Sequence, residues 1–304
     1  MAKRIANVIV DSPIREPLDY LVPADIEIQV GQRCLVPLGT RKVVGIVVGF
    51  SEESRFSKLR EVISRVDDIA PLSFGWLALT SFAARYYQSG WGQVAIPALP
   101  KFFRKLPGKL HERSLERLRK EKKRAVKEPS EKPHLNSEQS AIVEEFQMDG
   151  AFYPALIFGI TGSGKTEVYL HLMEKVLLSD PAAQVLLMVP EINLTPQLVE
   201  RVQSRFPQLE VVSWNSGMAE GQKASSWLAC HEGRARILVG TRLSVFASFK
   251  SLKLILVDEE HDPSFKSQEG VRYNARDLAL KRASIEKIPI VLGSATPSLE
   301  SYKN

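Results

Sequence analysis

Two short segments of this 304-residue chain have the residue types and the order that phosphoryl chemistry requires. The first, residues 159–166, reads GITGSGKT, and the second, residues 258–261, reads DEEH about ninety residues later. In the first, glycines let backbone N–H groups turn inward around phosphate oxygens at the start of a helix, whose dipole also favours an anion. The sequence therefore predicts a phosphate-binding loop (P-loop) followed by an acidic box.

The P-loop supplies a cation and a hydroxyl besides its backbone. We expect Lys165 to reach the β- and γ-phosphates of ATP and the Thr166 hydroxyl to ligate Mg²⁺. A glycine-rich turn without a ligand is the alternative, but the apolar strand before the loop and the helix expected over residues 167–178 argue against it. The residues predicted to bind the nucleotide here are Gly159, Gly162, Ser163, Gly164, Lys165 and Thr166.

The acidic box follows an apolar run, residues 252–257, that is typical of a buried strand. Ligands of open α/β sheets bind at the carboxyl ends of such strands. We predict that Asp258 holds Mg²⁺ through water and that Glu259 orients and deprotonates the attacking water. His261 is a further catalytic candidate beside Lys165, Asp258 and Glu259, with a hydrogen-bonded surface histidine as the alternative.

Two other segments carry polar groups next to strands. Residues 293–297, GSATP, follow an apolar run, and their two hydroxyls could relay the phosphate state, although a plain serine- and threonine-rich turn looks the same. Before the first strand of the sheet, Ser137 is a candidate helix N-cap and Gln139 a candidate reader of an adenine edge. On these residues alone, the N-cap interpretation is favoured.

Alternating strands and helices must position these segments. From residue 135 onward, apolar runs alternate with amphipathic stretches, and we expect strands at 155–158, 185–189, 210–213, 237–239, 252–257 and 288–292. This order predicts the α/β fold class, with a parallel sheet covered by helices on both faces.

The amino-terminal part has a different pattern. Residues 1 to about 100 contain short β runs at 6–10, 32–37 and 43–50, and one helical stretch around 76–88. Proline and glycine separate these runs, which predicts a small β-rich domain with one helix. We therefore expect three parts: a β-rich domain at 1–100, a basic linker at 101–134 and an α/β lobe at 135–304.

The positive charge of the chain lies mainly in the linker. Residues 101–134 hold thirteen Lys and Arg against five Glu, whereas the whole chain has a net charge of +6. Such a block suits a phosphate backbone, and a solvated helix face is the alternative.

Composition also excludes several classes of protein. The two cysteines, Cys34 and Cys230, are too few for a disulfide framework or a thiolate zinc site, so we expect reduced core residues. No apolar run approaches the ~20 residues of a membrane span, and the amino terminus has no cleavage site of a signal peptide. These features predict a cytoplasmic protein without a membrane partner.

Five segments, at 159–166, 189–192, 240–242, 258–261 and 293–297, have the order and spacing of motifs I, Ia, Ib, II and III of superfamily II helicases. The strings TGSGKTEVY, DEEHD with QEGVRYNARD, and GSATPSLE resemble more narrowly the PriA family of replication-restart helicases (primosomal protein N′). The resemblance covers residues 5–100 and 135–304. It implies a first RecA-like lobe that uses ATP and Mg²⁺ and moves 3′-to-5′ on DNA. It also implies forked and single-stranded DNA, primosome proteins and single-stranded-DNA-binding protein as partners.

The resemblance further implies which residues bind DNA. Residues 262–277 resemble the family's aromatic-rich loop, which couples single-strand binding to ATP hydrolysis, and the residues carried over are Phe265, Tyr273 and Arg276. The amino-terminal domain resembles the family's domain for the 3′ end of a nascent strand, with a pocket that maps to Leu18, Asp19, Gly39 and Arg60. A carboxylate fits a bond to a terminal 3′-hydroxyl, and glycine allows close backbone approach. Leu18 replaces an aromatic residue and Arg60 a lysine, so phosphate attraction is kept without stacking.

The chain also departs from that family. Residues 101–134 are too short for the winged-helix domain that the family carries there, and this basic segment is a candidate replacement. Because the chain ends at Asn304, just after motif III, we expect no second helicase lobe with its arginine fingers and no ligands of the family's zinc region. The 304-residue chain by itself should bind DNA and, weakly, ATP, with little turnover. A non-catalytic module that binds forked DNA is the alternative. A P-loop kinase or GTPase explains neither 240–242 nor the acidic box.

Overall fold

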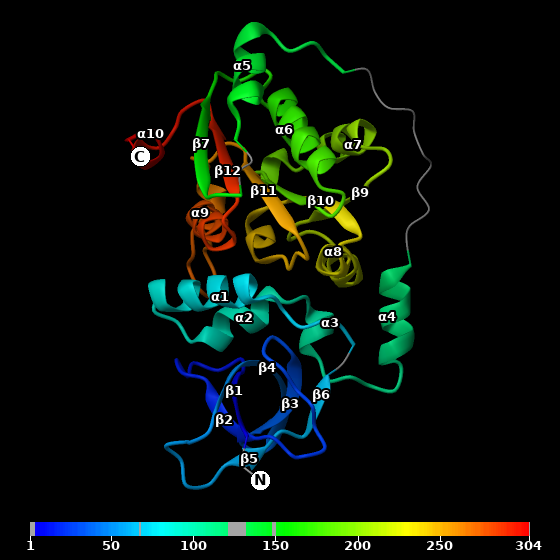
Figure 1. The fold of residues 1–304 in the computed structure, drawn as a ribbon, viewed down its shortest axis with the longest axis vertical. Helices are drawn as coiled ribbons and strands as arrows, with labels where there is room; N and C mark the ends of the chain where they lie inside the picture. The colour runs from blue at the N-terminus through cyan, green and yellow to red at the C-terminus, as the bar shows by residue number, and fades with distance from the viewer. Residues whose placement is uncertain (1–3, 67, 121–131, 148–149, 304) are drawn as a thin grey trace. The chain divides into compact units, whose positions relative to one another are not determined.

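The computed structural model describes residues 4–66, 68–120, 132–147 and 150–303 (Figure 1). Its contacts group into two compact units, residues 1–120 with 219–225 and residues 121–218 with 226–304, and each unit is described by itself. The division into parts at 1–100, 101–134 and 135–304 stays a prediction. Residues 121–131 of the predicted linker lie outside the described residues.

The second unit is built on a parallel sheet, as predicted. Its six strands are in the order β7-β12-β11-β8-β10-β9 (Figure 1). The central position of β11 places the acidic box, which follows it, in the middle of the carboxyl edge. The strands are β7 Tyr153–Phe158, β8 Gln184–Met188, β9 Glu210–Trp214, β10 Ala235–Gly240, β11 Leu252–Val257 and β12 Pro289–Ser294.

Helices cover both faces of this sheet. Val185 and Leu187 of β8 pack into the core that α6 and α7 build on one face, and Leu186 between them faces the other side of the sheet. On that other face α9 contacts β11 and β12. The helices are α5 Ser137–Glu145, α6 Lys165–Ser179, α7 Pro196–Arg205, α8 Glu220–Glu232, α9 Ala275–Glu286 and α10 Leu299–Lys303. Short 3-10 turns form at Glu191–Asn193, Arg242–Phe246 and Pro263–Phe265. This layered arrangement confirms the α/β fold class.

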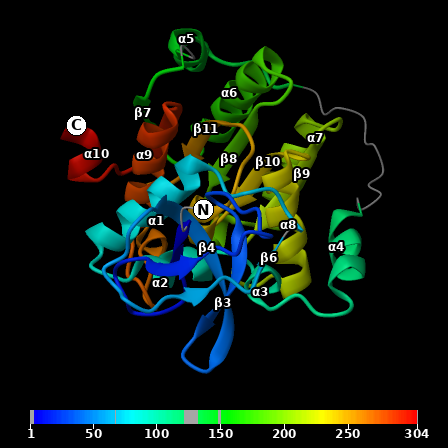
Figure 2. The same ribbon diagram turned by 60° about the horizontal axis from the view of Figure 1, so that its bottom comes forward.

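The first unit contains a six-stranded sheet in the order β5-β2-β1-β4-β3-β6. The strands are β1 Ile5–Ile9, β2 Leu18–Leu21, β3 Arg33–Leu38, β4 Arg41–Ser51, β5 Arg60–Glu61 and β6 Ser64–Val66. Because β5 pairs with β2 and β6 pairs with β3, one chain segment joins the two edges, and the sheet curls into a small barrel. The hairpin of β3 and β4 projects from it (Figure 2).

The expectation of one helix in this region is wrong. Beside α1 (Phe74–Tyr86) residues 1–100 contain α2 (Trp91–Ala98), and α3 (Lys101–Arg104) and α4 (His111–Arg119) follow in the basic segment. Helix α2 could not be predicted from the sequence because it contains a glycine and a proline, which are unfavourable inside helices. A Cβ at Gly92 would lie 1.6 Å from the Val10 carbonyl oxygen, so glycine lets α2 pack directly on the backbone after β1.

Both cysteines are free and fully buried, as predicted. Burial raises the pKa of both thiols, that of Cys34 to about 12, which keeps them protonated core groups. Within the described part of the chain, no helix has the length and apolarity that crossing a membrane requires.

Candidate nucleotide and DNA sites

The P-loop lies between β7 and α6 at the carboxyl edge of the parallel sheet. Gly162 and Gly164 adopt positive φ angles of 82° and 84°, which other residues rarely tolerate, so the loop curls over the start of α6. The Lys165 ammonium is almost fully buried and donates a 2.9 Å hydrogen bond to the Gly159 carbonyl. The same ammonium lies 3.5 Å from a Glu259 carboxylate oxygen, so motifs I and II meet at this edge.

Helix α5 reaches the P-loop through Gln139. The Gln139 amide donates to the Ser163 carbonyl at 2.9 Å and its oxygen accepts from the Asn136 backbone. Asn136, and not Ser137, is the N-cap of α5, because its side chain accepts from the Gln139 N–H. The Ser137 cap is therefore a wrong prediction. The predicted contact of the Gln139 amide with the adenine edge of ATP stays a prediction.

Asp258 is held by a tyrosine that the sequence does not mark. The Tyr169 hydroxyl of α6 donates a 3.0 Å hydrogen bond to the Asp258 carboxylate. The ring passes so close to Gly293 that a Cβ there would lie 1.6 Å from the hydroxyl oxygen. Burial is the main cause of a raised pKa of Asp258, and the nearby Glu259 carboxylate adds to it. A cation at this carboxylate would relieve that cost.

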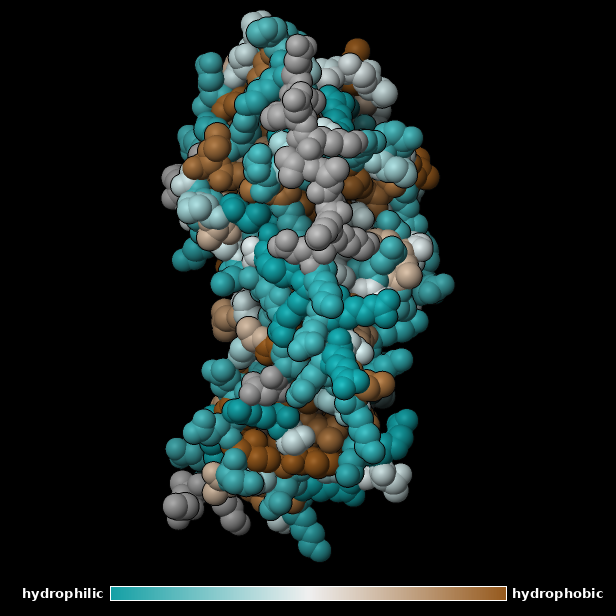
Figure 3. Space-filling view, turned by 90° about the vertical axis from the view of Figure 1, so that its right-hand side faces the viewer, coloured by the Kyte–Doolittle hydropathy of each residue, from teal (hydrophilic) through white to brown (hydrophobic). Residues whose placement is uncertain are grey.

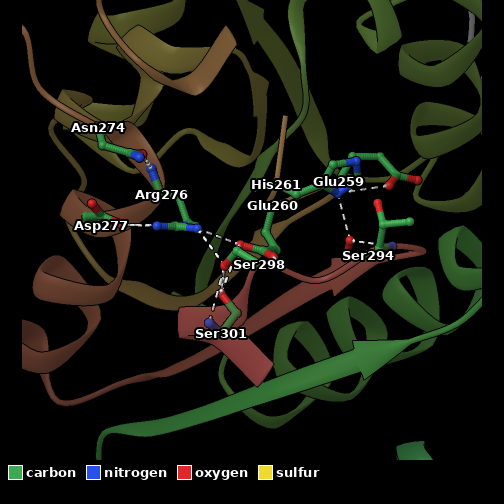
Figure 4. A network of polar contacts seen from close by, with 10 residues as sticks. Glu259, Glu260, His261, Asn274, Arg276, Asp277, Ser294, Ser298 and Ser301 are labelled. Atoms are coloured by element: carbon green, nitrogen blue, oxygen red, sulfur yellow. Dashed lines mark hydrogen bonds and ion pairs between the residues drawn. The ribbon is translucent and has the colours of Figure 1, made fainter. Parts of the chain in front are cut away.

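The residues after Asp258 connect motif II to motif III. Glu259 has a positive φ of 46°, a strained conformation that turns the chain at the end of β11. His261 lies 2.7 Å from the Ser294 hydroxyl, which also accepts from the Thr296 backbone at 3.0 Å (Figure 4). The Ser294 hydroxyl thus connects the turn at 293–297 to the acidic box, and its role as a relay of the phosphate state stays a prediction.

Glu260 is a buried junction that sequence reasoning missed. Its carboxylate accepts from the Ser298 backbone at 2.7 Å, from Ser301 at 2.9 Å and from Arg276 at 2.9 Å (Figure 4). Burial opposes ionisation of Glu260, but the Ser298 N–H and the Arg276 guanidinium outweigh it and hold the pKa below its ordinary value. Motif II, residue 276 and the segment after motif III thus share one carboxylate.

The predicted aromatic-rich loop, residues 262–277, folds against the lobe. Phe265 is 1% exposed and Tyr273 is 8% exposed, so neither ring offers a face to a base in this conformation. Tyr273 packs edge-on against Phe246. Arg242 donates to the carbonyls of residues 264 and 266, which attaches the loop to motif Ib. Of the three predicted residues, Arg276 is the one with a charged connection to the acidic box.

A second buried network, also absent from the predictions, stands behind the P-loop. Glu167, two residues after Lys165, forms ion pairs with Arg205 at 2.9 Å and Arg201 at 3.0 Å, both from α7. His171 lies 3.4 Å from the same carboxylate. The arginines neutralise a carboxylate that would otherwise repel nucleotide phosphates. They also join α6 to the helix that follows motif Ia.

The four predicted pocket residues of the first unit fall into two groups. Asp19 accepts hydrogen bonds from Asn7 at 2.9 Å and from Ser54 at 2.6 Å, and it lines an open hollow of about 500 Å³. Arg60 is hydrogen-bonded to the Gly39 carbonyl. Leu18, the neighbour of Asp19 on β2, packs against the barrel core. The structure thus places Asp19 in an open hollow, joins Arg60 to the Gly39 carbonyl, and leaves Leu18 as an apolar contact of the core.

No group of three or more His, Cys, Asp or Glu side chains is arranged to hold a metal ion among the residues described. Thr166 and Asp258, the predicted Mg²⁺ residues, supply one hydroxyl and one carboxylate. Mg²⁺ commonly takes one or two protein ligands and completes its shell with water and substrate phosphates. The donor set therefore fits an ion that arrives with a nucleotide.

Two family models match the chain. A model of the PriA-type 3′ DNA-binding domain matches residues 7–100, and the DEAD/DEAH box helicase model matches residues 136–304. Relatives match more widely. The replication restart protein PriA of Rickettsia felis is 35% identical over 99% of this chain and 44% of its own length. That of Haemophilus influenzae is 32% identical over 99% and 50%. The chain thus spans about half the length of these relatives.

Solved structures resemble the chain more distantly. The SWI2/SNF2 ATPase core of Sulfolobus solfataricus, in complex with dsDNA, has a TM-score of 0.38 and 16% identity over 57% of this chain and 34% of its own. The UvsW helicase of bacteriophage T4 has a TM-score of 0.38 and 15% identity, over 53% of this chain and 52% of its own.

Proposed function

Because the chain belongs to the DEAD/DEAH box helicase family, we propose that it is an ATP-dependent DNA helicase of replication restart that binds ATP and forked DNA. One observation carries the proposal most strongly. The Lys165 ammonium and the Glu259 carboxylate lie 3.5 Å apart at the carboxyl edge of the parallel sheet, from segments about ninety residues apart. That edge is where α/β sheets bind nucleotides.

ATP binding would use the backbone and one cation of the P-loop. Inward N–H groups around Gly162 and Gly164 bind phosphate oxygens, and Lys165 exchanges its bond to the Gly159 carbonyl for the β- and γ-phosphates. Ser163, which bonds to Gln139, holds the loop against α5. The Gln139 amide is the proposed reader of the adenine edge.

Hydrolysis would depend on the acidic box. Thr166 and Asp258 would hold Mg²⁺, which supplies charge neutralisation of the phosphates when bound. Glu259 orients a water molecule and accepts its proton as the water attacks the γ-phosphorus. His261, bonded to Ser294, reports the state of this site to motif III.

DNA would reach the nucleotide site through the loop at 262–277. We propose that Arg276 transmits the signal, because its guanidinium bonds to Glu260, the neighbour of Glu259. Phe265 and Tyr273 are buried, so contact with bases requires the loop to leave this conformation. Stacking on a released ring is worth ~1–3 kcal/mol per base, enough to favour such a change.

In the first unit, the hollow beside Asp19 is the proposed site for a DNA 3′ end. Its carboxylate accepts a bond from the 3′-hydroxyl, and Arg60 attracts the nearby phosphate. Gly39, whose Cβ position is open, lets the backbone approach. Leu18 offers only an apolar contact. On the family resemblance alone, we also propose that the protein moves 3′-to-5′ on DNA. The same resemblance suggests primosome proteins and single-stranded-DNA-binding protein as its partners.

A steady-state ATPase assay of the 304-residue chain with forked DNA tests the enzymatic part. We expect nucleotide binding with slow turnover of ATP. Turnover that equals a two-lobed helicase contradicts that expectation.

The competing function is a binding module for forked DNA whose nucleotide site is not used. Fork affinity of the wild type, Asp19→Ala and Lys165→Ala, each with and without ATP, separates the two. Under the proposed function, ATP changes the affinity of the wild type for forks and has no effect on Lys165→Ala. Under the competing function only Asp19→Ala matters.

A further inference from the structure

The basic segment forms one helix, α4, whose two sides differ. His111, Leu115 and Leu118 fall within one side, and Leu115 is 5% exposed. Residues four and seven apart return to the same side of a helix, because each residue turns it by about 100°. Arg113, Arg117 and the C-cap residue Lys120 therefore form a second stripe, about 140–160° from Leu115.

An ion cluster of the first unit fixes α4. Asp68 accepts from His111 at 2.5 Å, and the buried Arg33 guanidinium pairs with the same carboxylate. At the other end of the helix, Arg119 donates to the Asp68 backbone carbonyl at 3.0 Å. The His111 ring also stacks on Phe102 at 4.8 Å. A helix held at both ends presents its outer side in a fixed direction.

The outer side of α4 carries cations and no aromatic ring. Arg113, Arg117 and Lys120 are all exposed. In Figure 3, which faces the side of the molecule that carries α4, hydrophilic side chains cover the middle of the surface. Residues 112–120 contain no aromatic residue on which a base could stack. The two glutamates of the helix, at 112 and 116, lie to one side of the stripe.

We propose that this stripe of Arg113, Arg117 and Lys120, the α4 stripe, binds the phosphate backbone of duplex DNA. Duplex DNA has the higher density of negative charge and releases more counterions per neutralised phosphate than a single strand. Proteins that hold single strands add aromatic stacking, which α4 does not offer. The inference rests on the proposed function, because the duplex would be an arm of the fork.

The test compares two triple variants of the 304-residue chain. One is Arg113→Gln, Arg117→Gln and Lys120→Gln. The matched control is Lys250→Gln, Lys253→Gln and Lys287→Gln, three exposed lysines at the amino edge of the parallel sheet. Both remove three positive charges, and thermal melting checks that both fold. Affinity for a fork, a plain duplex and a single strand of equal length is measured over a range of salt concentrations.

We expect the α4 variant to bind the fork and the duplex at least tenfold more weakly than the control. The slope of log affinity against log salt should fall by about 2 to 3, since each phosphate contact contributes ~0.9. Single-strand affinity should change less than twofold. Equal duplex affinity of the two variants overturns the inference, and so does an equal loss for the single strand.

Failure of the proposed function gives a different pattern. If wild type and Asp19→Ala bind forks no better than plain duplex, fork recognition fails, whereas a loss of duplex affinity confined to the α4 variant still supports the stripe.

Discussion

At the scale of single residues, the ionised carboxylate of Asp258 lowers the stability of the folded chain unless a cation is bound beside it. Burial raises its pKa, so the ionised carboxylate destabilises the fold at neutral pH. Tyr169 supplies one hydrogen bond, and Gly293 leaves room for the tyrosine. The fold thus loses some stability at Asp258 and gains a carboxylate placed to bind a cation. Such a loss of stability at functional sites is common in natural proteins.

We predict that Asp258→Asn raises the melting temperature of the chain without nucleotide and abolishes its stabilisation by Mg²⁺ with ATP. The amide carries no charge and still accepts from Tyr169. Each kcal/mol should shift the melting temperature by roughly 2–4 °C for a domain of this size. Differential scanning calorimetry with and without Mg²⁺-ATP measures both effects, and an unchanged ligand shift in the variant would refute the assigned role.

Glu167 should be essential for stability, because it compensates buried arginine charge. We predict that Glu167→Ala costs about 3 kcal/mol of unfolding free energy, at the low end for a broken buried pair. Glu174 still lies 3.4 Å from Arg205, which limits the loss. The matched control is Arg201→Ala, whose side chain is 50% exposed and should cost about 1 kcal/mol or less. Urea unfolding of both variants measures this, and equal losses would contradict the account.

Residues of the P-loop and acidic box could be predicted from the sequence because their chemistry depends on local order. Tyr169, Glu167 and Glu260 could not, because the partners described for them above lie far along the chain: Asp258 is 89 residues from Tyr169, Arg205 is 38 from Glu167, and Arg276 and Ser298 are 16 and 38 from Glu260. Spacing along the chain carries no record of such contacts. The Ser137 error has the same origin, since only the backbone shows that Asn136 makes the cap.

At the scale of elements, Glu260 fastens three segments to one another. Its pKa is held below the ordinary value, so the group binds protons more weakly in the folded state than in the unfolded state. The resulting stabilisation is complete above the unfolded pKa near 4.5 and is lost as the pH falls through the lower folded value. The contact between Arg276 and motif II therefore depends on an ionised Glu260.

We predict that Glu260→Gln destabilises the lobe at pH 7 and that this difference from the wild type shrinks below about pH 4.5. Guanidinium unfolding of both proteins between pH 3.5 and 7, in steps of about half a unit, measures it. If the difference in unfolding free energy between the two proteins stays constant over that pH range, the charge of Glu260 does not contribute to stability, which would contradict the prediction.

Elements of the parallel sheet were predictable because mainly apolar runs alternate along the chain with helical stretches. The strands and helices of the first unit were harder to predict from the sequence. Strand β2 is four residues long between Pro17 and Pro23, and α2 contains Gly92 and Pro97. Each of these residues reads locally as a break. The tight packing of Gly92 on the β1 segment, which explains the helix, involves a residue 82 positions earlier.

At the scale of the whole molecule, one sequence contains a region that matches the model of the PriA-type 3′ DNA-binding domain and a region that matches the DEAD/DEAH box helicase model. The proposed duplex contact of α4 belongs to the segment between them. Together the proposals divide the chain into a proposed site for a DNA 3′ end, a proposed contact with duplex DNA and a proposed nucleotide site.

The most direct test of the central claim is an equilibrium titration of the 304-residue chain with a fluorescent ATP analogue, with and without Mg²⁺. Lys165→Ala removes the cation that meets Glu259, and Lys253→Ala, at the opposite edge of the sheet, is the matched control. We predict Mg²⁺-dependent binding by the wild type and the control, and at least a tenfold loss in Lys165→Ala. Equal binding by all three proteins would contradict the assignment of the nucleotide site.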